Sequence, residues 1–462
     1  MGKSLRSQVN MLEGPILKNI IIYTIPIILT GFLQLLFNAA DLVIVGQFCG
    51  SLSVAAVGAT NSVTSLLVNL FIGLSAGAGV ITANTLGAKD KNATFQTVHT
   101  AIPLALVSGV FLTIVGVFAS EPLLKLMKTP SDVLPLSATY MKIYFAGIIF
   151  MLLYNFGSAI LRATGDTKSP LLYLSIAGVI NVLLNIIFVT VFNLNVAGVA
   201  LATTISQGVS AFLVIRRLII RDDACRFYIT KMRFYKNQLI KIIKIGVPAG
   251  IQSSMFSISN VLIQSSVNGF GSAAVSGASA ASSIENFVFI AMNAFHQTGL
   301  NFAGQNAGAG NYKRIKKIAA TALCSVAVVG AVGGLLVWTF AKPLLGIYIT
   351  NSEEAVRYGF TKLTFICLPY FIEGIMDTTA GLLRGIGSTV APMLITIFGT
   401  CVFRVVWIYT VFALFKTYQV LLLSYVISWT ITFIIELIIF IVLVNKKERL
   451  YQAPGNNEAV KA

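Results

Sequence analysis

The feature that most constrains the fold is a series of apolar segments, each of about 20 residues or more, separated by polar connections. A helix of that length is needed to cross the hydrocarbon core of a bilayer. Across its 462 residues the chain is 56% hydrophobic and 11% charged. That composition leaves too little polar surface to cover a soluble globule of this size. We therefore predict an all-α polytopic membrane protein with twelve transmembrane helices at 17–47, 54–86, 93–119, 136–160, 170–192, 197–218, 241–268, 277–306, 315–341, 355–383, 391–415 and 418–444.

The formal net charge of +17 follows the expected topology rather than a nucleic-acid-binding surface. Lysine and arginine gather at the chain ends, beginning with Lys3 and Arg6, and in the even-numbered connections. Odd-numbered connections such as 48–53, 193–196 and 269–276 contain neither residue, and the exceptions, Lys125, Lys128, Lys342 and Lys416, are too few to reverse the pattern. Cytoplasmic loops of membrane proteins carry such an excess of positive charge. The pattern predicts that both termini are cytoplasmic, and we expect no nucleic acid partner.

The cysteines, histidines and candidate nucleophiles argue against a disulfide-linked protein, a metalloprotein and an enzyme. The five cysteines and two histidines show no paired spacing, so we predict neither a disulfide framework nor a Cys/His metal site. No cluster of nucleophile, acid and base lies at membrane depth, which argues against an enzyme.

The chain repeats itself at an offset of 222 residues. Pro26 matches Pro248, and the turn at 161–167 matches the turn at 383–389. Six spans is an even number, so both halves start on the same side of the membrane and form two six-helix lobes related by a pseudo-twofold axis along the membrane normal. Parallel repeats of this kind are typical of transporters, in which the substrate site lies between the halves. The predicted parts are an N-lobe, a cytoplasmic linker, a C-lobe and a cytoplasmic tail, at 1–218, 219–240, 241–445 and 446–462.

One carboxylate lies inside the first span. Asp41 shares a helical face with Gln34 and Asn38. An acid left in hydrocarbon costs several kcal/mol unless it is paired, protonated or ion-bound, so Asp41 predicts a functional site. The depth reached along each helix places the oxygen-bearing side chains of Asn181, Asn185 and Thr203 at the level of Asp41.

These four residues predict a cation site. A carboxylate with amide and hydroxyl oxygens suits a metal ion such as Na+, held by Asp41, Asn181 and Asn185, whereas a dry carboxylate alone can carry a proton. The alternative interpretation is that the polar side chains only join neighbouring helices by hydrogen bonds. The repeat argues for a specialised site, because the counterparts of Asp41, Asn181 and Asn185 at offset 222 are apolar: Ile263, Phe403 and Trp407.

The second half carries its own polar side chains within the spans. Glu373 and Asp377 share a face of the tenth span, after Pro369, which we expect to kink the helix. Arg404, at a comparable depth in the eleventh span, is their expected partner, and this charge cluster is either structural or part of a binding site. The predicted substrate cavity is also lined by polar residues of three other spans: Gln34, Asn38, Asn260, Gln264 and Glu285.

The motifs resemble those of the multidrug and toxic compound extrusion (MATE) family in its bacterial, NorM- and DinF-like branches. The similar features are Pro26 and Asp41 in the first helix, the Gly-Ala-Lys turn at 87–89, and the turn at 161–167 with its copy at 383–389. The resemblance covers essentially the whole chain. It implies a cation-coupled antiporter that expels organic cations and other toxic amphiphiles. It further implies an N-lobe cation site at Asp41, Asn181, Asn185 and Thr203.

The resemblance leaves some features open. The amide at Asn185, where archaeal members carry an acid, leaves the choice between Na+ and H+ coupling undecided. Glu373 resembles the C-lobe acid of NorM-type members, but the seventh helix lacks the acid that those members carry there.

Taken together, these patterns predict a secondary active multidrug exporter that works by alternating access. The alternative on the same scaffold is a flippase for a lipid-linked saccharide. We expect small drug-like substrates, a lipid bilayer as surroundings, Na+ or H+ as coupling ion with no other cofactor, a monomer, and a location in the bacterial inner membrane.

Overall fold

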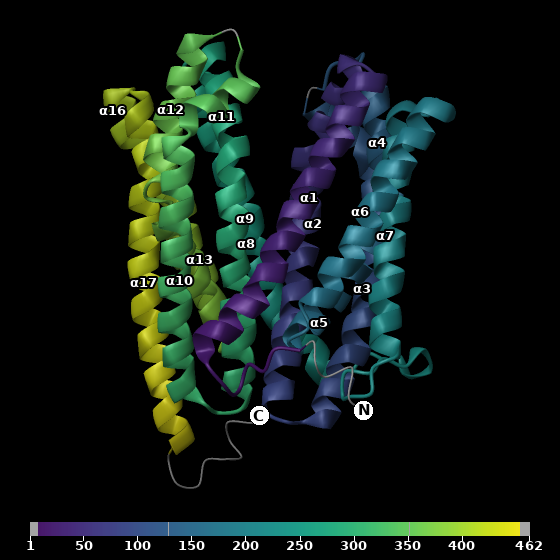
Figure 1. The fold of residues 1–462 in the computed structure, drawn as a ribbon, viewed down its shortest axis with the longest axis vertical. Helices are drawn as coiled ribbons and strands as arrows, with labels where there is room; N and C mark the ends of the chain where they lie inside the picture. The colour runs from purple at the N-terminus through teal and green to yellow at the C-terminus, as the bar shows by residue number, and fades with distance from the viewer. Residues whose placement is uncertain (1–7, 128, 351, 453–462) are drawn as a thin grey trace. The chain divides into compact units, whose positions relative to one another are not determined.

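The computed structural model describes residues 8–127, 129–350 and 352–452; Lys3, Arg6 and residues 453–462 of the expected tail lie outside these ranges. Within them every regular element is a helix (Figure 1). The α-helices of the first half are α1 (Ile16–Phe48), α2 (Ser51–Gly87), α3 (Lys91–Leu126), α4 (Leu134–Ala146), α5 (Ile148–Ala163), α6 (Lys168–Ile186) and α7 (Asn195–Ile219). Those of the second half are α8 (Lys236–Asn268), α9 (Ser272–Gly308), α10 (Tyr312–Thr339), α11 (Ala341–Tyr348), α12 (Glu353–Cys367), α13 (Tyr370–Gly385), α14 (Val390–Thr396), α15 (Phe403–Trp407), α16 (Ala413–Phe415) and α17 (Tyr418–Gln452). A 3-10 turn, η3 (Ile229–Lys231), lies in the linker, and three π-helical segments interrupt spans: η2 (Ile187–Val191), η4 (Ile397–Val402) and η5 (Ile408–Phe412).

These elements pack into two compact units. Unit 1 is formed by the chain up to Val9 and by Leu29–Gly250. Unit 2 is formed by Asn10–Ile28 and by the chain from Ile251 onward. Because α1 and α8 continue through these boundaries, each of them contributes residues to both units. In both helices the boundary comes two residues after the internal proline.

Each of the twelve predicted spans corresponds to a helix or to a set of consecutive helices. In the described part of the chain, nine elements are long and apolar enough to cross a membrane. Two bent pairs, α4 with α5 and α12 with α13, account for two further spans. The remaining predicted span, 277–306, lies in α9, a helix of 37 residues that is too polar to be recognised from composition alone. The all-α, twelve-helix fold is confirmed.

Breaks within the spans have local causes. The tenth span bends by 47° between α12 and α13, next to Pro369, as the sequence predicts. The fourth span bends by 46° at Gly147. The π segments η2 and η5 begin 221 residues apart, at Ile187 and Ile408. The internal repeat is therefore present in the backbone as well as in the sequence.

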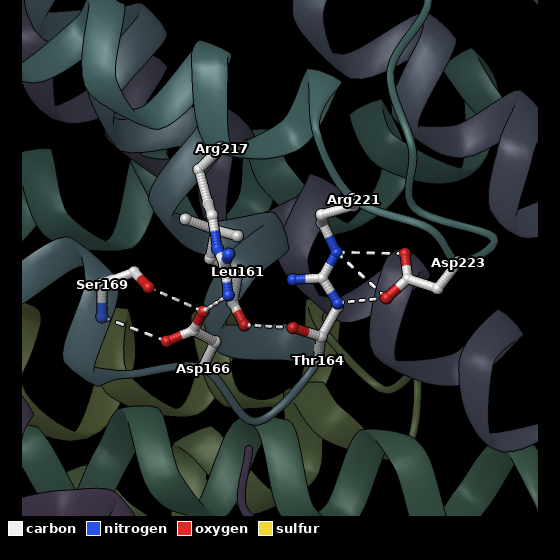
Figure 2. A network of polar contacts seen from close by, with 7 residues as sticks. All are labelled: Leu161, Thr164, Asp166, Ser169, Arg217, Arg221 and Asp223. Carbon is white, nitrogen blue, oxygen red and sulfur yellow. Dashed lines mark hydrogen bonds and ion pairs between the residues drawn. The ribbon is translucent and has the colours of Figure 1, made fainter. Parts of the chain in front are cut away.

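The turn at 161–167 has the same backbone conformation as its copy in the second half of the chain. Gly165 has a φ of 88° and its counterpart Gly387 a φ of 86°, a region in which glycine is favoured because it has no Cβ. Figure 2 shows that Asp166, on this turn, accepts hydrogen bonds from the backbone N–H and hydroxyl of Ser169, at 3.0 and 2.8 Å. Its second carboxylate oxygen also lies 3.5 Å from Nη2 of Arg217. The turn thereby joins the start of α6 to the end of α7.

A close helix crossing within unit 1 depends on glycine. Gly73 and Gly77 of α2 face Gly246 and Gly250 of α8. A Cβ placed on Gly77 would lie 2.5 Å from the carbonyl oxygen of Ile242 and 2.8 Å from the backbone nitrogen of Gly246. Small residues spaced four apart allow membrane helices to approach in this way.

An apolar cluster lies next to the predicted cation site in unit 1. It joins the end of α1 to α2, η2 and α7 about one turn beyond Asp41. Its buried members are Ile44, Val45, Ala56, Val57, Val133, Val189, Val196 and Val199. The packing holds the segment of α1 that carries Asp41 against the helices that carry its predicted partners.

Candidate functional site

The four residues predicted to bind a cation come together in unit 1. Nδ2 of Asn185, on α6, lies 2.5 Å from Oδ1 of Asp41, on α1. The same nitrogen lies 3.3 Å from Oδ1 of Asn181, one turn earlier on α6. Nδ2 of Asn181 lies 3.4 Å from the hydroxyl of Thr203 on α7, and Thr203 is close enough to Asp41 for the two side chains to interact.

The site is largely withdrawn from solvent and keeps free acceptors. Asn181 and Asn185 are 4% and 0% exposed, and Asp41 is half-buried. Oδ1 of Asn185 is buried without a hydrogen-bond partner, as is Oε1 of Gln207, one turn after Thr203 on α7. Buried oxygens of this kind are costly unless a donor or a cation satisfies them. The arrangement can therefore accept a positive charge beside the Asp41 carboxylate.

Two other predicted residues of α1 lie outside this hydrogen-bonded group. Gln34 and Asn38 are exposed, and neither takes part in the bonds that join Asp41 to α6 and α7. Tyr140 of α4, which sequence reasoning missed, is close enough to Asp41 for the two side chains to interact electrostatically. Because the sequence contains many aromatic residues, nothing in it indicated that this tyrosine lies near Asp41.

The two acids of the tenth span have different surroundings. Nδ1 of His296 lies 3.0 Å from Oδ1 of Asp377, and Asp377 also accepts a hydrogen bond from Asn293 at 3.1 Å. Glu373 is buried, and its Oε2 has no partner. Among the described residues, neither acid forms an ion pair with Arg404, but the charge of Arg404 acts on Glu373, so the predicted partnership is an electrostatic interaction with Glu373 rather than a direct contact.

Arg404 turns instead toward α17 and α8. Its Nε donates to the hydroxyl of Ser428 at 3.1 Å, and its Nη1 lies 3.4 Å from Oδ1 of Asn260. Its guanidinium lies 4.1 Å from the ring centroid of Tyr425, a cation–π contact. An aromatic face and neutral oxygens from the neighbouring helices therefore make the direct contacts of this side chain, while Glu373 interacts with its charge from farther away.

The other predicted residues of unit 2 lie apart from the Asp377 group. Oε1 of Glu285 lies 3.2 Å from Nζ of Lys362, a buried lysine on α12 that sequence reasoning missed. Lys362 also donates to Ser282 and to the carbonyl of Ala278. Gln264 is exposed and donates to Asn268, one turn later on α8.

Carboxylates with polar partners, set in a duplicated bundle of apolar helices, are typical of membrane transporters. The MatE family model matches residues 26–187 and again residues 248–410. The chain therefore belongs to the MatE family, and the resemblance seen in its motifs is confirmed. The two matched stretches also coincide with the two copies of the internal repeat.

Individual relatives agree with this assignment. The chain is 30% identical over 392 residues to the probable multidrug resistance protein YpnP of Bacillus subtilis (strain 168), covering 85% of this chain and 87% of that protein. It is 29% identical over 386 residues to the probable multidrug resistance protein YoeA of the same organism, covering 82% and 83%. Among solved structures it is similar to a crystal structure of MATE in the bent conformation, with a TM-score of 0.89 at 22% identity, over 96% of this chain and 99% of that one. At that identity the structural likeness supports the fold.

Proposed function

We propose that this transporter is a secondary active exporter that expels drug-like organic cations and other toxic amphiphiles in exchange for Na+ or H+ bound at Asp41. The observation that carries the proposal is the Asp41 carboxylate itself, bonded to Asn185 among helices of unit 1 beside an unpartnered buried oxygen. The names of YpnP and YoeA as multidrug resistance proteins support the choice of substrate class. We further propose that it acts in a bacterial inner membrane with both termini cytoplasmic, as a monomer.

The proposed role of Asp41 is to bind the coupling ion. An ion bound there favours one conformation of the transporter, and bound substrate favours the other. Binding of either one therefore lowers the affinity of the transporter for the other. The amide and hydroxyl oxygens of Asn181, Asn185 and Thr203 complete a ligand set for Na+. Without a metal ion, the same carboxylate takes up a proton and remains hydrogen-bonded to Asn185.

The test is uphill efflux of a fluorescent organic cation from proteoliposomes, with Na+ and pH gradients imposed separately. Asp41→Asn keeps the size of the side chain and removes its charge, so gradient-driven efflux is expected to fall to the level of empty liposomes. Asp132→Asn, at an exposed acid in a connecting loop, is the matched control and should transport normally. Undiminished ion-driven efflux by folded Asp41→Asn protein would refute the role of Asp41, and the gradient that drives the wild type identifies the ion.

A further inference from the structure

Unit 2 contains a buried chain of hydrogen bonds that is separate from the Asp41 group. Nη2 of Arg384 lies 2.6 Å from Oε1 of Gln252, and Nε2 of Gln252 lies 2.9 Å from Oγ1 of Thr396. The same hydroxyl lies 3.2 Å from Oε1 of Glu436. The four side chains come from α13, α8, α14 and α17, and their exposure falls from 7% at Arg384 to 0% at Glu436.

The direction of these bonds is fixed by chemistry. An arginine side chain can only donate, so the amide oxygen of Gln252 must face it and the amide nitrogen must face Thr396. The Thr396 hydroxyl accepts from that nitrogen, which leaves its own hydrogen for Glu436. Every donor along the chain therefore points toward Glu436, whose Oε1 accepts.

The other side of Arg384 fixes the charge of a histidine. Nη1 of Arg384 lies 3.2 Å from Nε2 of His296. Because Arg384 can only donate, Nε2 must be the unprotonated nitrogen, so His296 is neutral with its hydrogen on Nδ1. That hydrogen is directed at Asp377, whose carbonyl oxygen lies 2.7 Å from Nδ1. His296 therefore adds no positive charge to the interior.

The buried charges of unit 2 are unevenly compensated. Among the described residues of this unit, the buried charged side chains are Lys362, Glu373, Arg384, Arg404 and Glu436, whereas Glu285 and Asp377 are half-buried. An uncompensated negative charge among membrane helices is unfavourable. A buried carboxyl group that forms no ion pair is therefore expected to hold a proton.

Glu436 is the most deeply buried of these acids, at 0% exposure against 8% for Glu373, and like Glu373 it forms no ion pair among the described residues. Glu285 has Lys362 at 3.2 Å, Asp377 has His296 and Asn293 as donors, and the charge of Arg404 acts on Glu373. Glu436 has the Thr396 hydroxyl and reaches Arg384 only through two neutral side chains. Its second oxygen, Oε2, is buried with no partner.

We propose that Glu436 is a proton-binding site of unit 2, which takes up and releases one proton at Oε2. No other bond changes, because the Thr396 hydroxyl stays on Oε1. The bound species is a proton rather than a metal ion, since a hard cation requires several oxygen ligands and the described residues bring no group of three or more Asp, Glu, His or Cys together. Glu436 lies ten residues, or about 15 Å of helix, before the basic end of α17 at Lys446.

The groups that face Glu436 set its proton affinity. Arg384 and Asp377 of α13 act on it with opposite charges. From α14 and η4 it meets neutral hydroxyls, Thr396 and, one turn away, Thr400, which is bonded to Thr432 of α17 itself. The charge of Glu436 is therefore linked to the state of Asp377 through the shared Arg384.

Infrared difference spectroscopy of the purified full-length protein, recorded from acidic to alkaline pH, tests this inference. The wild type is expected to show the carbonyl band of a protonated carboxylic acid that disappears as the pH rises. Glu436→Gln should lose that band. Thr396→Val removes the hydroxyl that stabilises the charged form, so the band should persist to higher pH. Glu448→Gln, on the same helix at an acid paired with Lys316 at 2.5 Å, is the matched control and should leave the band unchanged.

The inference is overturned by a wild-type band that does not change with pH, or by a Glu436→Gln spectrum that matches the wild type. If Glu436→Gln does not fold, the shift in Thr396→Val decides, and an unshifted band there also counts against the proposal. A protonated Asp41 would give a carbonyl band of its own, which remains in Glu436→Gln and is lost in Asp41→Asn. Only the band that Glu436→Gln removes is therefore assigned to Glu436, so the result is separable from the role proposed for Asp41.

Discussion

Cys225, in the linker, is a buried thiol held by its neighbours. It is 0% exposed, and its backbone N–H donates to Oδ1 of Asp223 at 2.9 Å. Figure 2 shows that Asp223 is in turn held by the guanidinium of Arg221. Burial raises the pKa of the Cys225 thiol from its ordinary value of 9.0 to about 12, because the charged thiolate is poorly solvated there. The thiol thus stays protonated at neutral pH.

This environment predicts slow alkylation. With the pKa raised from 9.0 to about 12, the thiolate fraction at neutral pH falls about a thousandfold, and the thiolate is the reactive species. In a variant whose other four cysteines are replaced by serine, Cys225 should react with a maleimide only after unfolding, as mass spectrometry can show. A control cysteine at the exposed neighbour, Asp222→Cys with Cys225→Ser, should react at once. Equal rates in the folded protein would contradict the structure.

Sequence reasoning at the residue scale succeeded where helical periodicity alone decides. Asp41, Asn181 and Asn185 stand out as polar groups in apolar runs, and their depth follows from the rise of a helix. The direct contacts of Arg404 could not be found in this way. Its choice of Tyr425 and Ser428 depends on which helices are neighbours and how each is rotated, and a single sequence supplies neither. Lys362 was missed for the same reason, because its ion-pair partner, Glu285, lies on another helix.

At the scale of elements, α2 and the first half of α8 pack closely because the glycines at their crossing have no side chains. The crossing predicts that Gly77→Ala destabilises unit 1, because its Cβ would lie 2.5 Å from the Ile242 carbonyl. The expected loss in free energy of unfolding is about 1–3 kcal/mol, as for other overpacked sites. Thermal unfolding in detergent measures it.

Gly58, on the same helix, has no atom within 4 Å of its ideal Cβ position and supplies the control. Gly58→Ala should leave stability unchanged or raise it by up to about 1 kcal/mol, because alanine favours a helix more than glycine does. If Gly77→Ala were as stable as Gly58→Ala, the close crossing of α2 and α8 would be wrong.

Most of the membrane-spanning helices could be predicted from their apolar sequences. The breaks within the spans and the polar helix α9 could be predicted only in part. The bend at Pro369 was predictable because proline lacks the donor that an unbroken helix needs. The π segments η2 and η5 carry no such residue, and no local signal indicated them. The helix α9 is too polar to pass as a span on composition, yet the repeat assigns it as the counterpart of α2.

At the scale of the whole molecule, duplication preserved the scaffold while the chemistry diverged. The crossing of Gly77 with Gly246 in unit 1 has its counterpart in unit 2, where the hydroxyls of Thr24 and Thr298 lie 2.8 Å apart. Within the spans, unit 1 carries the Asp41 carboxylate on α1, whereas unit 2 has its acids on α9, α13 and α17. Each unit thus acquired buried charge independently, on helices that the repeat does not match.

This divergence predicts that an acid cannot simply be restored at the position equivalent to Asp41. Ile263 is 3% exposed and packs in an apolar cluster with Val267, Tyr418 and Leu422. Ile263→Asp should therefore lower the stability of unit 2 by about 3 kcal/mol, the order of the penalty for an acid at the centre of a membrane helix. It should not add a second ion dependence to efflux.

Asn260→Asp, one turn earlier on α8, places the same charge where Nη1 of Arg404 lies 3.4 Å away from the side-chain oxygen. Because that arginine can pair with the new carboxylate, this variant should unfold at the wild-type temperature or above it. Comparing the two melting curves separates the effect of charge from that of position. An Ile263→Asp protein as stable as Asn260→Asp would mean that the two halves are interchangeable at this site, contrary to the packing around Ile263.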